Sequence, residues 1–469
     1  MLISSCRRRS LAVALAVALL PAAAGAATIT VTTSADGSVP DQCTLRDAIA
    51  AANTNAAVAG CASGDVGNDE IVFAPEVTGT IALTSGQLTI SDKVIISGPG
   101  ADALTIDAQG QSRLFDIEGD QETSYETTLS GLTLTGGRTT ADGENGGAVR
   151  SMSAFHLVDS VVSGNSTAGA NAVGGALATA TTTEILRSRI TRNWTEGYGG
   201  LAGGVMVVFG AASVVDSTIA GNWTQGDKAG GGGIVVFWYW FDATFVNSTL
   251  SDNETRGNGS QAGALAVGGN AFLINSTVSG NRTLGDNAEG GFIDGGAMSV
   301  SGNITLSNST VVDNASVSAG GVAIAIAANP GTGLIMATNS VIASTAEGGA
   351  ALCSKPLEVA GSTHNIATDA SCGNDTLIGG VPVAAAALAL APLADNGGPT
   401  WTHALLPGSV AIDSGDDDAC AAAPVGNLDQ RSHPRPQDGN GDGTAACDVG
   451  AYEADELDRI FADGFDAAL

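Results

Sequence analysis

The chain has few aromatic and few basic residues. Of its 469 residues, 4% are aromatic, and 18 Lys and Arg stand against 48 Asp and Glu, which gives a formal net charge of −30. DNA, RNA and anionic membranes bind basic surfaces, so this charge argues against all three as partners. Proline is also scarce, with 13 residues. Because glycine shows no period of three, a collagen-like helix is excluded as well.

Glycine, in contrast, is abundant. The chain has 65 Gly, about twice the usual share, and 44% of its residues are hydrophobic. So high a hydrophobic content argues against disorder. The length alone would allow about three domains of ~150 residues each. The glycine, together with the shortage of charged and aromatic residues, instead favours a single all-β repeat protein.

Residues 1–27 are typical of a bacterial signal peptide. Three arginines at 7–9 precede an apolar run at 11–20, and Ala-rich sequence follows to 27. The run is too short to span a membrane, so no transmembrane segment is expected after its removal. Loss of the three arginines would change the net charge from −30 to −33. We expect a protein that is secreted or held at the cell surface or outer membrane.

Six of the seven cysteines follow the predicted signal peptide, and they form three close pairs along the chain. Closeness in sequence favours the disulfides Cys43–Cys61, Cys353–Cys372 and Cys420–Cys447. An even number of cysteines in an exported chain fits an oxidising compartment. Zinc is the weaker alternative, because no Cys-x-x-Cys occurs and the four His are scattered.

The centre of the chain repeats a seven-residue phrase that ends in Asn. Successive copies begin 28 to 33 residues apart. The clear copies are Asp159–Asn165, Arg187–Asn193, Asp216–Asn222, Asn247–Asn253, Asn275–Asn281 and Asn308–Asn314. A glycine pair such as Gly146-Gly147 or Gly174-Gly175 precedes most copies, and we interpret these pairs as corners with positive φ.

Short apolar segments between these phrases alternate with a period of two, as strands of three to five residues do. One unit cannot bury its own apolar face, but stacked units can. The sequence therefore predicts a single-stranded right-handed parallel β-helix with coils of about 28–33 residues. About ten coils at a spacing of ~4.8 Å would form a rod on the order of 50 Å long. The corner Asn side chains should stack as a ladder. A β-propeller is the weaker alternative, since its blades need ~40 residues.

The two ends depart from the repeat. Residues 43–53 predict an amphipathic helix, with Leu45, Ala48, Ile49 and Ala52 on one face, that caps the first coil. We expect an N-terminal cap at 28–70, β-helix repeats at 71–350 and a C-terminal tail at 454–469. Residues 351–453 are expected to form irregular last coils, held by Cys420–Cys447.

Motifs at both ends carry a family resemblance. Near the N-terminus, Cys43-Thr-Leu-Arg-Asp-Ala-Ile49 resembles the Cys-Ser-Leu-Arg-Glu-Ala-type motif of a family of bacterial exported proteins. The C-terminal region resembles the choice-of-anchor Q region of the same proteins, through Asp395-Asn-Gly-Gly-Pro-Thr400, Asp429-Gln-Arg431 and Asp448-Val-Gly-Ala-Tyr-Glu453. The middle is similar to right-handed β-helix repeats of the pectin-lyase-like and polymorphic outer-membrane kinds. The resemblance implies a cell-surface or secreted protein.

Parallel β-helices often carry polysaccharide lyases and hydrolases, so an enzyme is the alternative function. A lyase of this kind would need an Arg beside clustered acids that hold calcium, and a hydrolase would need paired carboxylates. The central coils have few Arg and no Asp-Asp pair. The common nucleophile, zinc-protease and nucleotide motifs are also missing from the sequence. We assign no catalytic residue.

One segment matches a calcium loop. Asp438-Gly-Asn-Gly-Asp-Gly443 places oxygens at positions 1, 3 and 5 and Gly at position 6. The usual Glu at position 12 is replaced by Val449, one residue after Asp448. Asp438, Asn440, Asp442 and Asp448 are therefore candidate ligands of a structural calcium ion. The alternative is an ordinary Asp/Gly turn.

Most of the tryptophans lie in three successive coils. Trp194 and Trp223 each follow a corner Asn and should stack on adjacent coils, and Phe237–Phe241 form an insertion in the next coil. Aromatic rings can pack against the CH faces of sugars. We therefore predict a sugar-binding platform beside Asp227 and Arg256 that consists of Trp194, Tyr198, Trp223, Trp238, Tyr239 and Trp240. The alternative is ring stacking that only covers the flank of the rod.

The function that the sequence favours is non-catalytic: adhesion, matrix contact or glycan binding by an exported monomeric rod. The expected partner is a polysaccharide or a host or matrix surface, and no nucleic acid. An acidic polysaccharide would be repelled by the net charge unless calcium intervened.

Overall fold

The computed structural model describes residues 27–119, 126–285, 295–316, 324–329, 333–345, 351–456 and 458. The predicted signal peptide up to residue 26, the end of the tail from residue 459 and the Gly320-Gly321 pair lie outside the described residues. Among the described residues, no helix is both long enough and apolar enough to span a lipid bilayer.

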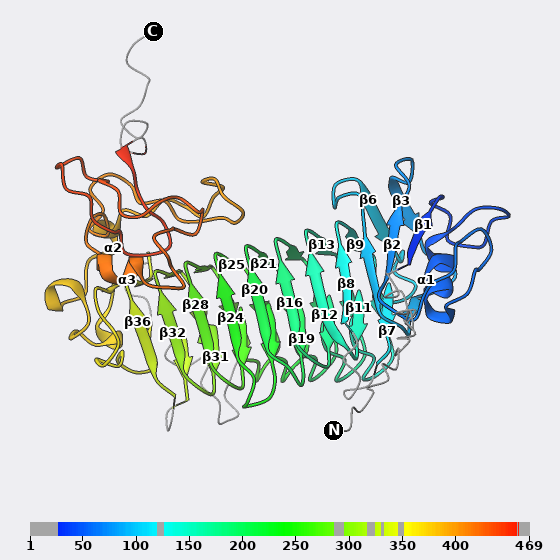
Figure 1. Cartoon of the computed structure of the whole chain (residues 1–469). Helices are drawn as coiled ribbons and strands as arrows, with labels where there is room; N and C mark the ends of the chain where they lie inside the picture. The colour runs from blue at the N-terminus through cyan, green and yellow to red at the C-terminus, as the bar shows by residue number, and fades with distance from the viewer. Residues whose placement is uncertain are drawn as a thin grey trace, which may run out of the picture.

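The described chain forms a right-handed parallel β-helix, as the repeat predicts (Figure 1). Four sheets run along its axis, and every pair of neighbouring strands within them is parallel. We name them sheets I to IV in the order in which one coil visits them: β12 in sheet I, β13 in sheet II, β14 in sheet III and β15 in sheet IV.

The strands of each sheet follow one another along the axis. Sheet I contains β1 (Thr28–Val31), β2 (Asp69–Phe73), β5 (Val94–Ser97), β8 (Glu126–Ser130), β12 (Ala154–Val158), β16 (Thr183–Leu186), β20 (Ala212–Val215), β24 (Ala243–Val246), β28 (Ala271–Ile274), β32 (Ile304–Ser307) and β36 (Ile335–Thr338). Sheet II contains β3 (Gly79–Ala82), β6 (Leu104–Asp107), β9 (Thr133–Thr135), β13 (Val161–Ser163), β17 (Arg189–Thr191), β21 (Thr218–Ala220), β25 (Thr249–Ser251), β29 (Thr277–Ser279), β33 (Thr310–Val312), β37 (Val341–Ala343) and β38 (Ile366–Ala367). Sheet III contains β10 (Arg138–Thr139), β14 (Ser166–Thr167), β18 (Trp194–Thr195), β22 (Trp223–Thr224), β26 (Glu254–Thr255), β30 (Arg282–Thr283) and β34 (Ala315–Ser316). Sheet IV contains β4 (Leu88–Ile90), β7 (Phe115–Ile117), β11 (Val149–Ser151), β15 (Leu177–Thr179), β19 (Val205–Val207), β23 (Ile234–Val236), β27 (Leu265–Val267), β31 (Gly295–Val300) and β35 (Ile324–Ala328).

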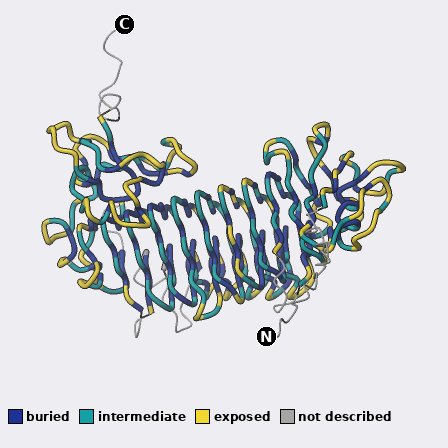
Figure 2. The backbone as a smooth tube through the Cα atoms, viewed as in Figure 1, coloured by how far each residue is buried: buried dark blue, intermediate teal, exposed yellow. Residues whose placement is uncertain are grey.

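The core is a stack of inward-facing side chains. In β12, Phe155 and Leu157 are fully buried, whereas the residues between them face outward and are only partly covered. Strand side chains alternate between the two faces, so each coil adds its apolar residues to one continuous interior. This interior appears as the dark blue inner stretches of the successive coils in Figure 2.

The predicted asparagine ladder is present and buried. Six corner Asn residues in successive coils make five bonds, in each of which the side-chain Nδ2 donates to Oδ1 of the Asn in the next coil, at 2.8 to 3.0 Å. The same Oδ1 also accepts the backbone N–H of the preceding ladder Asn. The members are Asn165, Asn193, Asn222, Asn253, Asn281 and Asn314. An Asn side chain therefore ties each coil to its neighbour.

The glycine pairs serve two purposes, of which only one was predicted. In Gly146-Gly147 and Gly174-Gly175 the first glycine does have a left-handed backbone, with φ of 73° and 70°. In the next two pairs the left-handed residue is the one before the pair, Ala202 or Gly231. The second glycine is required by close packing between coils. A Cβ on Gly175 would lie 2.3 Å from the carbonyl oxygen of Gly203. The interpretation of both glycines as positive-φ corners was therefore half right.

The N-terminal cap is confirmed. Helix α1 (Leu45–Thr54) begins at residue 45 because the Thr44 side chain accepts the backbone N–H of Asp47 as the N-cap. The helix buries its apolar face against β1, β2 and β4 at the blue end of the rod (Figure 1). Disulfide Cys43–Cys61 holds its start. The pairs Cys353–Cys372 and Cys420–Cys447 are also bonded as predicted.

The C-terminal region continues the coils irregularly at first and then leaves them. Cys353 forms a parallel bridge to Ile326 of sheet IV, Thr363 one to Thr338 of sheet I, and β38 pairs with β37 of sheet II. After the short turns η1 (Ala370–Cys372) and η2 (Ile378–Gly380), the chain forms a lobe that includes α2 (Ala385–Leu388) and α3 (Asp417–Ala421). This lobe, residues 384–456, lies against the outer face of sheet II above β25 (Figure 1).

Burial along sheet II shows where the lobe begins to cover it. The three residues of β21 are alternately half-buried and buried, but all three residues are buried in β25, β29, β33 and β37. Polar side chains of these strands bond to the lobe: the Thr249 hydroxyl donates to the Trp401 carbonyl at 2.6 Å. Lacking the repeat, residues 384–456 cannot extend the ladder and pack on its side instead.

Candidate functional site

A groove lies on the outer face of sheet IV. Its floor consists of the central residues of three consecutive strands, Val235, Ala266 and Ser299, which pair in register, and Met206 is the equivalent residue of the preceding strand. Their neighbours along each strand, such as Val205 and Val207, belong to the interior. Although they face outward, Met206 and Val235 are only 4% and 5% exposed. Both sides of the floor are therefore raised.

The first wall is a stack of glycine-rich turns between sheets III and IV. Tyr198, Asp227 and Asn258 occupy the same place in successive turns, because the backbone N–H of Gly199 donates to the Asp227 carbonyl and that of Lys228 donates to the Asn258 carbonyl. The Asp227 carboxylate accepts the backbone N–H of Asn258 at 2.8 Å. The wall thus presents a phenol, a carboxylate and an amide, one per rung.

The second wall is the aromatic insertion after β23. Trp238 stacks on Phe209 of the preceding coil with ring centroids 5.7 Å apart, and on Trp240 at 6.2 Å. Phe237 meets Trp238 edge to face. Gly268 leaves room beneath the insertion, since a Cβ there would lie 2.6 Å from the Phe237 carbonyl oxygen. Tyr239 and Trp240 remain 65% and 77% exposed.

The two walls and the floor enclose a cavity of about 1140 Å³. This volume is slightly above the range of ~300–1,000 Å³ that is typical of ligand sites. Tyr198, Trp238 and Tyr239 line it, as do the polar side chains of Gln261, Ser299 and Ser301. Among its described lining residues, Asp227 is the one carboxylate and Lys228 the one amino group.

The structure divides the six predicted platform residues between two places. Tyr198, Trp238 and Tyr239 line the groove, and Trp240 stacks on Trp238. Trp194 and Trp223 instead lie on sheet III, where they stack as predicted, with centroids 5.0 Å apart and planes 2° apart. They are not among the lining residues of the groove.

Trp194 and Trp223, the pair on sheet III, already contact other side chains through their rings. Each ring covers the other, and the Arg256 guanidinium lies 4.8 Å from the centre of Trp223 on that ring's face. The Trp194 indole N–H donates to Glu196, which in turn pairs with Arg138. These contacts match ring stacking that covers the flank of the rod.

Lys228 and Gln261 line the groove and Phe209 supports Trp238 in its wall, and none of the three was predicted from the sequence. Phe209 could have been found, because it precedes Trp238 by one coil. Lys228 and Gln261 carry no motif that distinguishes them from other loop residues.

The side chains of all four predicted calcium ligands accept backbone N–H groups. Asp438 accepts the backbone N–H groups of Gly441 and Gly443, and Asp442 accepts that of Thr444, so the loop oxygens bond within their own turn. Asp448 is fully buried and accepts the backbone N–H groups of Asp413 and Ala454. Within the described part of the chain, no group of three or more His, Cys, Asp or Glu side chains is placed to hold a metal ion. Calcium binding stays a prediction.

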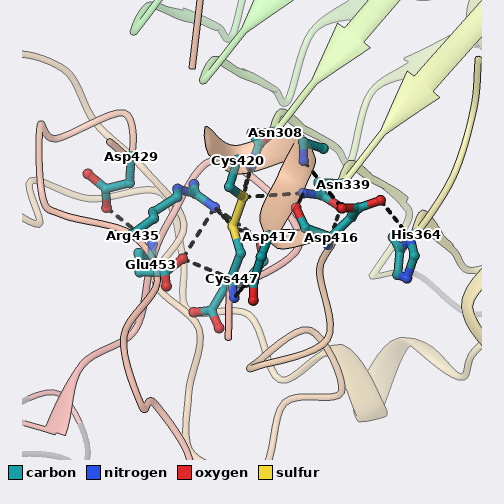
Figure 3. The surroundings of a disulfide bond; sticks show 12 residues. Asn308, Asn339, His364, Asp416, Asp417, Cys420, Asp429, Arg435, Cys447 and Glu453 are labelled. Carbon is teal, nitrogen blue, oxygen red and sulfur yellow. Dashed lines mark hydrogen bonds and ion pairs between the residues drawn. A yellow bond between two sulfur atoms is a disulfide. The ribbon is translucent and has the colours of Figure 1, made fainter. Parts of the chain in front are cut away.

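Two of the C-terminal motifs, at 429–431 and 448–453, are buried and contribute to a polar centre of the lobe (Figure 3). The Arg435 guanidinium lies 3.3 Å from Glu453, and both side chains are fully buried. Asn308 and Asn339 of the solenoid donate their amides to Cys420 Sγ, so the Cys420–Cys447 disulfide contacts the coils directly. These residues attach the lobe to the β-helix.

Two acids in this centre have perturbed pKa values. Burial raises the pKa of Asp448 to about 8, and the nearby Glu453 carboxylate adds to the rise. Burial raises the pKa of Glu453 to about 7, against the lowering effect of Arg435. Both groups are deep inside the lobe, so the shifts bear on stability.

Fold and groove together define a right-handed parallel β-helix protein with an open external groove. No protein-family model and no curated protein matches the chain. A solved structure titled "Crystal structure of pectate lyase Pel9A" is similar, with a TM-score of 0.48 and 14% identity, covering 92% of this chain and 98% of that chain. A likeness this low carries no argument about function.

Proposed function

We propose that the protein is an exported, non-catalytic β-helix protein that binds a glycan in the groove of sheet IV. The observation that carries this proposal is the pairing of an aromatic wall with an apolar floor in one cavity of about 1140 Å³. Sugars combine CH faces with hydroxyl edges, and aromatic side chains with a polar tip match both. The three disulfides support export, since they persist in oxidising compartments.

The polar groups of the groove favour binding over hydrolysis. General acid–base cleavage of a glycosidic bond uses a pair of carboxylates about 5 to 10 Å apart. Among the described lining residues, Asp227 is the one carboxylate, and no Arg accompanies it. This composition supports recognition of a ligand rather than chemistry on it.

The test is binding of oligosaccharides to the purified chain, measured by calorimetry after a glycan-array screen. Tyr239→Ala should weaken binding by about 10-fold, because it removes an aromatic contact worth about 1.5 kcal/mol. Tyr239 is 65% exposed, so its removal should leave the fold intact. Trp401→Ala, which removes a 54% exposed ring on the lobe, is the matched control and should bind normally. Equal affinities of both variants, or no binding of any glycan, would overturn the proposal.

A further inference from the structure

We infer that the ligand of the groove is an uncharged glycan, and that Asp227 selects it by accepting a sugar hydroxyl. This inference rests on the proposed function and names the class of ligand. It follows from three features: the order of the wall residues, the balance of charge around the cavity, and the apolar floor.

The wall and floor residues are matched rung by rung. Tyr198 shares a coil with Met206, Asp227 with Val235, and Asn258 with Ala266. Rungs are ~4.8 Å apart, which is about the length of one pyranose unit. Successive units of a chain parallel to the axis would therefore meet a phenol, a carboxylate and an amide. Each of these groups can bond to a hydroxyl without requiring a charge on the sugar.

Asp227 has capacity left for a ligand. Its Oδ1 accepts the backbone N–H of Asn258, which fixes the carboxylate in the wall. Its other oxygen has no hydrogen-bond partner among the described residues, and the side chain is exposed at the cavity. A hydroxyl donor to an ionised oxygen makes a stronger bond than one to a neutral acceptor. A carboxylate on the ligand would instead be repelled there.

The charge around the groove gives an anionic glycan little support. Lys228 supplies one positive charge beside the negative charge of Asp227, so the described lining residues are neutral in sum. The whole chain carries −30, and such a field slows the approach of polyanions. Screening acts over about 8 Å at physiological salt, so the repulsion should weaken as salt is added.

The floor also suits an uncharged sugar. Val235 is 5% exposed and lies in a small apolar cluster with Met206, Ala202 and Ala178. A charged group placed over this surface would lose its hydration without gaining a partner. The CH face of a neutral pyranose loses little hydration there and gains dispersion contacts.

The experiment compares linear oligosaccharides of equal length: hexamers of glucose, mannose and xylose against hexamers of galacturonic and glucuronic acid. We expect the best neutral hexamer to bind about 10-fold or more tightly than either acidic hexamer at low salt, with a smaller gap at high salt. An acidic hexamer that binds as tightly as the best neutral one overturns this inference but leaves glycan binding intact. If no hexamer binds, the proposed function fails together with the inference.

Two charge variants test the role of Asp227. Asp227→Asn keeps the shape and the acceptor for Asn258 but should weaken neutral-glycan binding by about 10-fold, since a charged acceptor is lost. Lys228→Gln, on the neighbouring residue, should change it by less than about threefold. Both side chains are exposed, and unchanged unfolding midpoints would show that the fold is retained. Loss of binding in Lys228→Gln alone would indicate an anionic ligand and overturn the inference.

Discussion

Single asparagines hold neighbouring coils together. Asn222 accepts two hydrogen bonds from Asn193 and donates to Asn253 Oδ1 and to the Ile190 carbonyl, all at 2.9 to 3.0 Å and all buried. Four groups therefore lose a partner when this one side chain is removed. Buried polar groups left unpaired each cost about 1–3 kcal/mol.

Asn222→Ala should lower the free energy of unfolding by about 3 kcal/mol or more. Chemical denaturation followed by circular dichroism measures the change. Asn68→Ala is the control, because Asn68 is exposed in a loop of the N-terminal cap and should give almost no change. Equal effects of the two substitutions would show that the ladder contributes no more than a surface residue.

The acids inside the lobe make its stability depend on pH. The pKa of Asp448 rises from 3.8 to about 8 and that of Glu453 from 4.5 to about 7 on folding. At a pH between the ordinary pKa of each acid and its raised pKa, the folded state keeps a proton that the unfolded state has released. The stability from both groups is fully present below their ordinary pKa values and is lost as the pH rises through the folded ones.

We therefore expect the thermal midpoint of the lobe to fall as the pH rises from about 5 to about 9. In Asp448→Asn the thermal midpoint should fall less steeply with pH, because one of the two titrating groups is gone. Asp418→Asn, which changes an exposed acid of the same lobe, should keep the slope of the unaltered chain. A midpoint that rises with pH, or an equal slope in Asp448→Asn, would contradict this assignment.

Among the larger elements, the lobe packs on sheet II through an apolar cluster and through buried polar contacts. Gln430 is fully buried, donates to the hydroxyls of Thr249 and Thr400, and accepts the hydroxyl of Thr277 at 2.7 Å. It therefore joins β25 and β29 to the lobe through one side chain. Buried hydrogen bonds of this kind are costly to leave unmade.

Gln430→Ala should loosen the lobe without disturbing the coils. Hydrogen exchange should become faster in peptides from 384–456, while peptides from β11 to β20 keep their protection. Gln225→Ala, an exposed position on sheet III, should leave both regions unchanged. Faster exchange throughout the chain would mean that lobe and solenoid unfold as one unit.

The elements that could be predicted from sequence are those whose contacts repeat. Each ladder Asn bonds to its copy one coil later, so the spacing of Asn165 and Asn193 already indicates their contact. Gln430 bonds to Thr249, which lies 181 residues earlier and outside any shared motif. No periodicity signals such a contact, which is why the last residues were expected to continue the coils.

The groove was only partly predictable for the same reason. Trp194 and Trp223 share a repeat position, and their stacking followed from it. The insertion at Trp238 interrupts the repeat, so its direction depends on packing against Phe209 and Gly268. The sequence predicts an aromatic surface. It does not predict which sheet carries the cavity, because that depends on how the coils pack.

On the scale of the whole molecule, the chain is strongly acidic, whereas the described lining of the groove carries no net charge. The rod carries a net charge of −30, yet the groove pairs one acid with one amine over an apolar floor among its described residues. Charge of one sign keeps such a protein soluble, and a neutral groove then restricts which glycans can enter it. We therefore expect a glycan to occupy this groove and no other face of the molecule.

Hydrogen exchange with and without the tightest-binding hexamer tests that claim most directly. Exchange should become slower only in 198–201, 227–239, 258–268 and 299–301, the segments that supply both walls and the floor. Slower exchange on the open part of sheet II, on the Trp194–Trp223 stack or in the lobe, with none at the groove, would contradict it.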